Sequence, residues 1–302
     1  MNILITGGAG FIGTKLANKL SKKNKIYILD FPSKIKKKSK YLKNCSLVSG
    51  DIRNKNTFSK INNRIDLVYH LAALCSTEMS EKYPRQCYAT NVDGTKNLLK
   101  WCIKKKVKKI IFTSSMAVYG RNSPKIKENA KCKPVSVYGK TKLMSEKILL
   151  TQSDKIKTII LRLFNVYGPG QDLNNEVQGM FSIYLKHAIS YKKVFVKGSL
   201  SRVRDFVYIN DVISALKYNY KSSDIYNVGS GKPNKVIDVI KSIFKHLKIK
   251  FKKNLIQNIK KHKGDTHISY ANINKIKKIG WSPKYNLQKG SKITISKINS
   301  WK

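Results

Sequence analysis

Residues 6–13 of this 302-residue chain read TGGAGFIG and are the most informative segment about its fold. It follows an apolar run at residues 2–6 and opens a segment, residues 11–21, whose apolar residues recur at helical spacing. Glycines here allow a tight turn and let the backbone approach a pyrophosphate, whose charge is met by the N–H groups at the helix start. The candidate contacts in this turn are Gly7, Gly10, Phe11, Ile12 and Gly13.

Acidic residues close the next two apolar runs. Asp30 ends the second run, at the position where the ribose hydroxyls of a bound dinucleotide are expected. This favours NAD as the cofactor, because a carboxylate repels the extra phosphate of NADP; two lysines that follow closely weaken the preference. Asp51 and Ile52 end the third run and are placed to meet the adenine.

Short apolar runs alternate with longer helical patterns over the first 170 residues. This alternation predicts an α/β fold with a parallel, doubly wound (Rossmann) sheet, whose ligand lies at the carboxyl ends of the strands. The expected strands are residues 2–6, 25–30, 46–52, 67–73, 108–115 and 158–164, and the expected helices are residues 11–21, 86–106 and 139–151.

The alternation stops after Gly168-Pro169-Gly170, where we expect a domain boundary. We assign residues 1–170 to a cofactor-binding domain, to which the chain returns at about 206–232. Residues 171–302 then form a smaller, mostly helical C-terminal lobe that binds the substrate.

The charge balance is strongly basic, with 62 Lys and Arg residues against 16 Asp and Glu, a formal net charge of +46. Such a field attracts polyanions, so a nucleic-acid partner has to be considered. The lysines recur throughout the chain, which favours a generally basic surface over one specific nucleic-acid-binding stripe. No apolar run approaches the ~20 residues needed to cross a bilayer.

The cysteines and histidines predict no metal site. The five cysteines are scattered, without the CxxC spacing of zinc or redox pairs, and we interpret them as reduced thiols of a cytoplasmic protein. The chain enters its first strand without a charged leader, which agrees with that location.

A second group of polar residues points to redox chemistry on a hydroxyl group. Ser115 closes the fifth apolar run, and Tyr138 and Lys142, four residues apart, share one face of a predicted helix. A tyrosine titrates near pH ~10, and lowering its pKa by about three units takes roughly 4 kcal/mol. Lys142 and an oxidised nicotinamide, both cationic, favour the phenolate. Alone, such a Tyr–Lys pair is more often a solvated face; the Gly turn and Ser115 before it favour catalysis.

Further segments carry a resemblance that runs almost end to end. The chain resembles the extended short-chain dehydrogenases/reductases, in particular the NAD-dependent nucleotide-sugar epimerase/dehydratase family, and is most similar to its UDP-glucose 4-epimerases. The segments that carry this resemblance are LAA 71–73, NVDGT 91–95, RLFNVYGP 162–169, RDFVY 204–208, YNVGSG 226–231 and GDT 264–266.

The resemblance implies roles for individual residues. Ser115, Tyr138 and Lys142 would form the catalytic triad, with Tyr138 and Lys142 also contacting the cofactor. Further cofactor contacts would come from Leu71, Ala72, Ala73, Asn91 and Phe164. The substrate would be held by Ser115, Asn165, Arg204, His262 and Ser269, with Arg204 on the diphosphate because its planar fork suits phosphate oxygens.

Two departures from the family pattern, and one small residue at a position that contacts the sugar, sharpen the assignment. Met116 and Ala117 replace the Asp-Glu pair of the 4,6-dehydratases, which disfavours dehydration and also decarboxylation. His262 stands where an arginine usually helps to clamp the diphosphate. Ser269 falls where the family gates the 2-substituent of the sugar, and so small a side chain leaves room for an acetamido group.

The expected function is NAD-dependent epimerisation of a UDP-hexose at C4, with glucose/galactose or N-acetyl forms, through a transient 4-keto sugar. The resemblance also implies a homodimer built from residues 86–106 and 139–151, and a place in polysaccharide synthesis. One alternative is another sugar-nucleotide oxidoreductase or reductase of the same family. A less favoured one is a Rossmann scaffold that binds RNA, since such a chain has no need of Ser115, Tyr138 and Lys142 in register.

Overall fold

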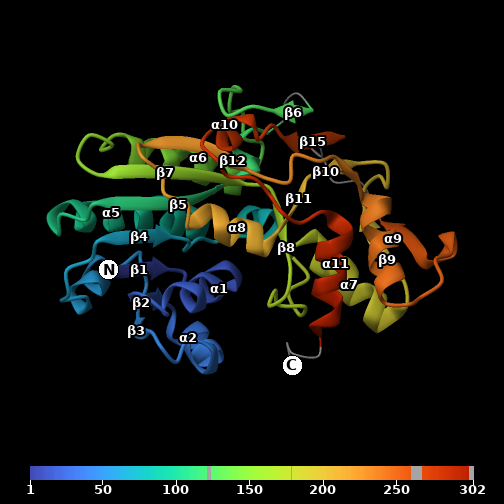
Figure 1. Ribbon diagram of the computed structural model, residues 1–302, viewed down its shortest axis with the longest axis horizontal. Helices are drawn as coiled ribbons and strands as arrows, with labels where there is room; N and C mark the ends of the chain where they lie inside the picture. Colours follow the sequence, from blue (N-terminus) through green and yellow to red (C-terminus); the bar gives the residue numbers. More distant parts are fainter. Residues whose placement is uncertain (121–123, 178, 260–266, 299–302) are drawn as a thin grey trace. The chain divides into compact units, whose positions relative to one another are not determined.

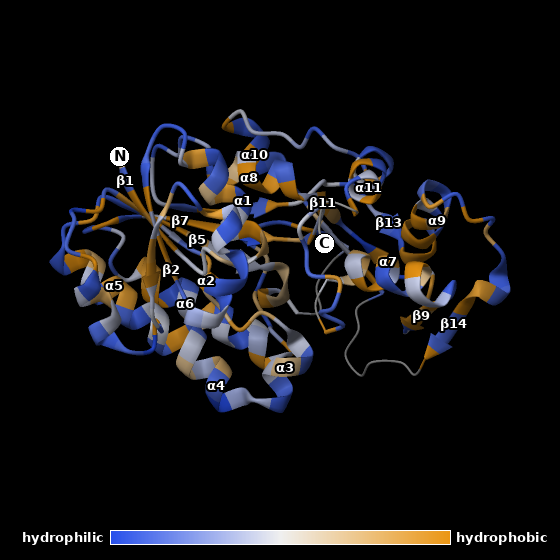
Figure 2. Ribbon diagram, turned by 90° about the horizontal axis from the view of Figure 1, so that it is seen from below, coloured by the Kyte–Doolittle hydropathy of each residue, from blue (hydrophilic) through white to orange (hydrophobic). Residues whose placement is uncertain are grey.

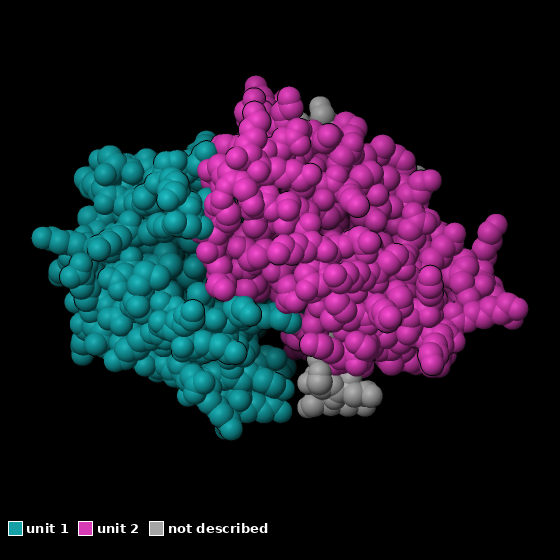
Figure 3. Space-filling view, in the orientation of Figure 1, with its two compact units in different colours: residues 1–118, 136–162, 219–225 teal, residues 119–135, 163–218, 226–302 magenta. Residues whose placement is uncertain are grey.

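The computed structural model describes residues 1–120, 124–177, 179–259 and 267–298. They form two compact units, distinguished by colour in Figure 3. The first unit comprises Met1–Val118, Ser136–Arg162 and Asn219–Ile225, and the second comprises Tyr119–Val135, Leu163–Tyr218 and Tyr226–Lys302.

A seven-stranded sheet has the order β12-β7-β5-β4-β1-β2-β3 and contains the strands of the first unit; residues 226–228 of its edge strand β12 belong to the second unit (Figure 1). The ladders of β1 with β2 and β4, of β2 with β3 and of β4 with β5 are all parallel, which confirms the predicted doubly wound architecture. The strands are β1 (Asn2–Thr6), β2 (Lys25–Asp30), β3 (Ser46–Ser49), β4 (Leu67–His70), β5 (Lys109–Ser115), β7 (Lys157–Leu163) and β12 (Asp224–Val228).

Apolar strands and amphipathic helices build the core of this unit. Figure 2 shows strands β1, β2, β5 and β7 in hydrophobic colours, whereas the helices alternate between polar and apolar residues. Leu98 and Leu99 of one helix and Leu149 of another pack against strand residues such as Leu4 and Ile110. The helical segments are α1 (Phe11–Leu20), α2 (Pro32–Lys38), η1 (Ser39–Tyr41), η2 (Lys55–Lys60), α3 (Thr77–Lys82), α4 (Pro84–Tyr88), η3 (Ala89–Asp93), α5 (Gly94–Lys104), η4 (Met116–Val118) and α6 (Val137–Leu150).

The single helix predicted at residues 86–106 is interrupted by η3, a π-helical turn. The side chain of Asn91, in this turn, bonds to both backbone polar groups of Leu74: its Oδ1 accepts from the nitrogen at 2.8 Å and its Nδ2 donates to the oxygen at 3.2 Å. Such turns frequently occur at functional sites. Strands β3 and β4 also end before the predicted residues 52 and 73, so Asp51, Ile52 and Leu71–Ala73 lie in the loops beyond the strands.

The second unit combines helices with small sheets that the sequence did not predict. Its sheets have the orders β13-β10-β15-β6, β11-β8 and β14-β9, with strands of only two to four residues. So short a strand shows no measurable apolar alternation. The elements are β6 (Lys125–Ile126), β8 (Asn165–Tyr167), α7 (Met180–Tyr191), β9 (Val194–Lys197), β10 (Val203–Arg204), β11 (Phe206–Tyr208), α8 (Ile209–Leu216), β13 (Asn234–Lys235), α9 (Val236–His246), η5 (Lys253–Leu255), β14 (Ile256–Ile259), β15 (Ile268–Ala271), α10 (Asn274–Lys278) and α11 (Leu287–Ser296).

In the described part of the chain, no helix is both long and apolar enough to span a membrane.

Candidate functional site

The Gly turn between β1 and α1 is a close-packed backbone cradle. Gly7 has a φ of +70°, and a Cβ added to it would lie 2.6 Å from the nitrogen of Ala72; one added to Gly13 would lie 2.6 Å from the Cα of Gly8. Only glycine fits at these positions. No side chain caps the start of α1 at Gly10, so the helix N-terminus is open to a negatively charged ligand. These features fit the pyrophosphate of a dinucleotide.

Asp30 lies at the end of β2 with both carboxylate oxygens bonded to the backbone. Its Oδ2 accepts from the nitrogen of Ala9 at 3.0 Å, within the Gly turn, and its Oδ1 accepts from the nitrogen of Phe31 at 2.8 Å. Burial raises the pKa of Asp30, although these two bonds act in the opposite direction. The carboxylate is thereby fixed beside the turn, as the ribose-binding prediction requires.

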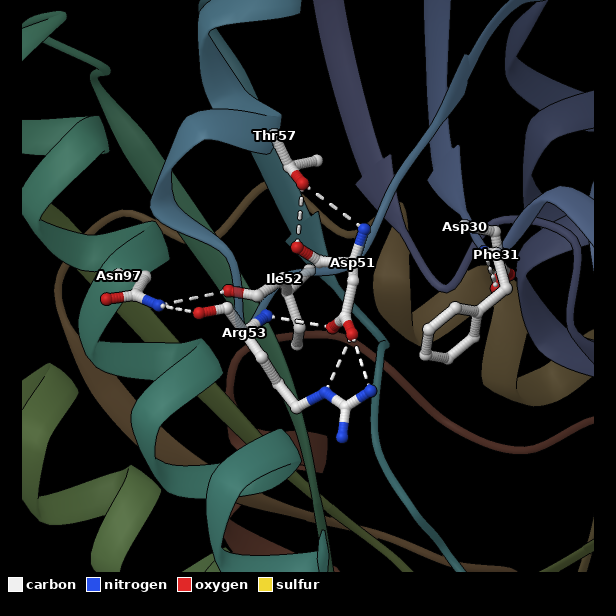
Figure 4. A network of polar contacts seen from close by, with 7 residues as sticks. All are labelled: Asp30, Phe31, Asp51, Ile52, Arg53, Thr57 and Asn97. Carbon is white, nitrogen blue, oxygen red and sulfur yellow. Dashed lines mark hydrogen bonds and ion pairs between the residues drawn. The ribbon is translucent and has the colours of Figure 1, made fainter.

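The loop after β3 holds Asp51 and Ile52 through several polar contacts (Figure 4). Arg53 donates to Asp51 Oδ2 from Nε at 2.7 Å and pairs with it through Nη2 at 2.6 Å. Thr57 Oγ1 bonds to the nitrogen and oxygen of Asp51, and Asn97 Nδ2 donates to the oxygens of Ile52 and Arg53. Burial opposes ionisation, but the bonds and charge of Arg53 outweigh it and lower the pKa of Asp51.

Leu71 and Ala72 follow β4 and approach the end of β1. The nitrogen of Leu71 donates to the oxygen of Thr6 at 3.0 Å, and that of Ala72 lies 3.4 Å from Thr6 Oγ1. Asn91, also predicted as a cofactor contact, is buried, and its Nδ2 donates to Thr141 Oγ1 at 2.9 Å besides its bonds to Leu74. Its amide therefore joins this loop to the helix that carries the predicted catalytic tyrosine.

Helix α6 positions Tyr138 through a fully bonded first turn. The nitrogen of Val137 donates to Glu81 Oε1 at 2.9 Å, and that of Tyr138 donates to Ser80 Oγ at 3.1 Å. The nitrogen of Gly139 donates to Oγ of the N-cap residue Ser136 at 3.0 Å. Capping a helix start in this way stabilises it and fixes where it begins. Two of these acceptors come from α3, so α3 and α6 are fixed together at Tyr138.

The side chains of Tyr138 and Ser115 lie close enough to interact. Burial raises the pKa of the Tyr138 phenol, and the hydrogen bond with the Ser115 side chain acts in the opposite direction. The direction is opposite to the sequence-based expectation of a lowered pKa, because in the protein alone desolvation outweighs the groups that favour the phenolate. Ser115 itself accepts from the nitrogen of Ala117 at 3.2 Å, which orients its hydroxyl.

Lys142 is buried on α6, one turn after Tyr138. Its side chain is among the largest buried in the protein, and its Nζ lies 4.0 Å from the centroid of the Phe112 ring. Burial lowers the pKa of Lys142 to about 8, against the opposing effects of Cys75, Glu146 and Cys87. The ammonium form therefore still predominates at neutral pH.

His70, which the sequence analysis did not single out, ends β4 in this same region. Its ring stacks on Phe112, with centroids 5.3 Å apart, and burial lowers its pKa to about 3. Its Nε2 lies 2.9 Å from Thr95 Oγ1, and its Nδ1 lies 2.8 Å from Thr6 Oγ1. The Thr95 hydroxyl donates its own proton to the backbone oxygen of Asn91. The neutral ring thus donates to Thr95 and accepts from Thr6.

A buried ion pair, also missed from sequence, lies on the same helix as the predicted catalytic residues. Glu146, one turn after Lys142, pairs with Arg162 of β7 at 2.6 Å. The sequence places Glu146 on a predicted helix and Arg162 on a predicted strand, and it does not show that the two side chains meet. The ion pair is seen only in the folded chain.

The second unit brings together three of the predicted substrate residues. The side chain and backbone nitrogens of Asn165 both donate to the oxygen of Asp205, at 2.8 and 3.1 Å, and Asp205 follows Arg204 directly. Arg204 and Ser269 are register partners across β10 and β15, and both are buried. Among the described residues, the Ser269 hydroxyl has no hydrogen-bond partner. Phe164, the predicted nicotinamide neighbour, is buried beside Asn165.

Asp205 organises this group and was not recognised from sequence as a site residue. Its carboxylate accepts from the nitrogen and hydroxyl of Ser230, at 2.7 and 2.6 Å, and from the nitrogens of Gly231 and Ala271, at 2.9 and 3.1 Å. A Cβ at Gly229 would lie 2.5 Å from Asp205 Oδ2, which explains the glycine. The predicted substrate contact His262 lies outside the described residues.

Comparison with known proteins identifies the family of the chain. The model of the NAD dependent epimerase/dehydratase family matches residues 3–229. A putative UDP-glucose 4-epimerase of Methanocaldococcus jannaschii is 34% identical over 301 residues, which cover 97% of each chain.

Two solved structures are similar over nearly the whole length. The UDP-glucose 4-epimerase of Thermotoga maritima, crystallised with UDP-glucose, has a TM-score of 0.92 and 31% identity, and 99% of each chain is covered. The UDP-glucose 4-epimerase of Thermus thermophilus, in complex with NAD, has a TM-score of 0.86 and 28% identity, and 98% of each chain is covered.

Proposed function

Because this chain belongs to the NAD-dependent epimerase/dehydratase family, we propose that it interconverts the C4 epimers of a UDP-hexose with tightly held NAD. The observation that carries the proposal is the closeness of the Tyr138 and Ser115 side chains, with the buried Lys142 one turn further along α6. The UDP-glucose 4-epimerases of T. maritima and T. thermophilus, and the relative in M. jannaschii that bears the name putative UDP-glucose 4-epimerase, support the reaction class.

In this proposal the Gly turn and Asp30 hold the pyrophosphate and ribose of NAD, and Asp51 and Ile52 meet its adenine. When bound, oxidised NAD supplies a hydride acceptor and a positive charge. Tyr138 takes the proton of the sugar 4-hydroxyl and later returns it, while Ser115 holds the hydroxyl in place. Lys142, an ammonium below about pH 8, stabilises the phenolate form of Tyr138.

The residues beside Ser115 favour epimerisation over elimination. Met116 and Ala117, which follow Ser115 in η4, have no titratable side chain that could act as an acid or base for loss of water. The 4-keto sugar formed by Tyr138 is therefore expected to be reduced again in the same site. The net redox change is zero.

We further propose that Arg204 and Asn165 bind the nucleotide diphosphate portion of the substrate. The guanidinium of Arg204 is a planar donor group whose Nη1 bonds to the backbone oxygens of Val203 at 2.8 Å and His267 at 3.4 Å, and the Asp205 network fixes the backbone beside it. Ser269, register partner of Arg204, has a small side chain whose hydroxyl lacks a partner in the described structure. We infer that it admits an acetamido group, so that N-acetylated hexoses are substrates too.

The proposal includes a cytoplasmic homodimer in which residues 86–106 and 139–151 pair with their copies. Residues 171–302 supply most substrate contacts, and His262 is the proposed additional diphosphate contact.

The experiment is incubation of the purified protein with UDP-glucose and with UDP-N-acetylglucosamine, without added nicotinamide cofactor, followed by chromatographic separation of the C4 epimers. Formation of UDP-galactose or UDP-N-acetylgalactosamine supports the proposal. Turnover that requires one added nicotinamide per product would instead identify a reductase or oxidase of the same family. A panel of dTDP- and GDP-sugars tests the nucleotide.

A further inference from the structure

The Glu146–Arg162 pair is buried and multiply bonded within the first unit. Arg162 Nη2 lies 2.6 Å from Glu146 Oε2, and Arg162 Nε lies 3.0 Å from Oε1. The side chains of Glu146 and Arg162 are only 2% and 4% exposed. Ser114 Oγ also donates to Glu146 Oε1. Burying two charges is expensive, and such a pair is weak grounds for stability by itself.

The pair connects the elements that carry the proposed catalytic residues. Glu146 lies on α6, one turn after Lys142 and two turns after Tyr138. Ser114 lies on β5, directly before Ser115, and Arg162 lies on β7. One carboxylate therefore fixes the helix of the proposed acid–base residues against the strand of the serine that orients the substrate.

Glu146 is also the carboxylate that acts on Lys142. Other groups around this ammonium in the described residues are the neutral His70 of β4, the Phe112 ring of β5, and the thiols Cys75 and Cys87. A thiol favours the ammonium only when it is ionised. Burial raises the pKa of Cys87 and so disfavours its ionised form. Glu146 raises the pKa of Lys142 and so opposes the effect of burial.

We propose that Glu146, held by Arg162 and Ser114, is a positioning residue of the epimerase reaction that holds Lys142 and the start of α6 in place against the strand of Ser115. This inference rests on the proposed function, since it assigns Lys142 a part in stabilising the phenolate of Tyr138. Glu146 acts through Lys142 and Ser115 and does not itself touch the substrate.

The variant that tests the proposal is E146Q/R162M. Replacing both partners removes the charges without leaving a buried arginine unpaired, which is the main hazard of E146Q alone. The matched control is E176Q/K186M, which removes a 2.6 Å ion pair whose Glu176 side chain is 50% exposed, in the second unit. Thermal melting and NAD content establish that each variant is folded.

Two readouts distinguish positioning from a merely structural role. We expect kcat of E146Q/R162M at pH 7.5 to fall at least about tenfold with KM little changed, and the alkaline limb of the kcat–pH profile to move to lower pH by about half a unit or more. The control should match the wild type in both. A uniform loss of kcat with an unshifted profile would overturn the proposal.

A direct titration separates this inference from the proposed function. Lysine side chains labelled with ¹³C at Cε are followed by NMR as a function of pH, and the Lys142 resonance is assigned by its absence in K142M. The proposal requires that Lys142 titrates at lower pH in E146Q/R162M than in the wild type. If the wild type is an active epimerase and Lys142 titrates at the same pH in E146Q/R162M, the positioning role is refuted. If the wild type has no epimerase activity but Lys142 titrates at lower pH in the variant, only the proposed function is refuted.

Discussion

The ammonium of Lys142 lies over the aromatic face of Phe112, with Nζ 4.0 Å from the ring centroid. A cation over an aromatic ring is stabilised by about 2 kcal/mol or more when it is shielded from water. Phe112 also stacks on the neutral ring of His70. A buried lysine can therefore keep its proton at neutral pH, although its pKa is lowered to about 8.

Phe112→Leu is expected to lower the pKa of Lys142 further. Loss of about 1–2 kcal/mol of cation–ring attraction corresponds to roughly one pH unit. Because the ammonium is lost as the pH rises, the alkaline limb of the kcat–pH profile should move to lower pH by about that amount. The control is Phe58→Leu, which alters a ring stacked on Trp101 in the same core. An identical profile in F112L and F58L would contradict the role of the ring.

Tyr138→Phe is expected to lower kcat by about 10²–10⁴-fold, the usual range for a group that transfers a proton in the transition state. The phenol hydroxyl is removed, while the capped start of α6 and the Gly turn remain. NAD released from the denatured variant should therefore equal that from the wild type, mole for mole. Wild-type kcat in Y138F would exclude Tyr138 as the acid–base group.

His70→Gln is expected to flatten the dependence of stability on pH. The folded pKa of His70 is about 3, well below its ordinary value of 6.5, so the unfolded chain binds more protons as the pH falls below 6.5. The stability that the neutral ring contributes is present above pH 6.5 and is lost progressively towards pH 3. Between pH 7 and 5 the loss amounts to about 2 kcal/mol.

Urea unfolding at pH 5, 6 and 7 measures this effect. The free energy of unfolding should fall by about 2 kcal/mol more in the wild type than in H70Q. His187→Gln is the matched control, because that ring is only partly buried. Parallel curves for the wild type and H70Q would show that His70 is not buried in its neutral form.

Arg53→Gln is expected to weaken the binding of NAD modestly. Arg53 fixes Asp51 Oδ2 and lowers the pKa of Asp51, but the pair is partly exposed, so a loss of about threefold to tenfold in affinity is expected. Calorimetry with NAD and with its hypoxanthine analogue, which lacks the adenine amino group, measures it. If Asp51 meets the adenine amine, the variant should lose more affinity for NAD than for the analogue; equal losses would contradict this placement.

The sheet of the first unit was predictable because its determinants are local. Each of these determinants occupies a short segment whose period or composition reveals its structure. They are the Gly turn, Asp30 at the end of a strand, and the four-residue spacing of Tyr138 and Lys142. Strand ends were less predictable, because β3 and β4 stop where backbone bonding to neighbouring segments changes.

The features missed from sequence depend on contacts between distant residues. Arg162 and Glu146 meet only when β7 packs beside α6. The neutral state of His70 follows from its burial, and the hydroxyls that bond its ring come from Thr6 and Thr95, which precede and follow it in the chain. Asp205 likewise collects donors from Ser230 to Ala271. The raised pKa of Tyr138 was missed for the same reason, because burial cannot be judged from a four-residue spacing.

In the proposed reaction a hydride leaves C4 and returns to the same sugar within one site. The most direct test uses UDP-glucose, or UDP-N-acetylglucosamine, deuterated at C4, mixed with unlabelled substrate and followed by mass spectrometry of both epimers in the absence of added NAD. We expect a C4-epimeric product that keeps its deuterium, with none in solvent. Deuterium lost to water, or a product that forms only with stoichiometric added cofactor, would contradict it.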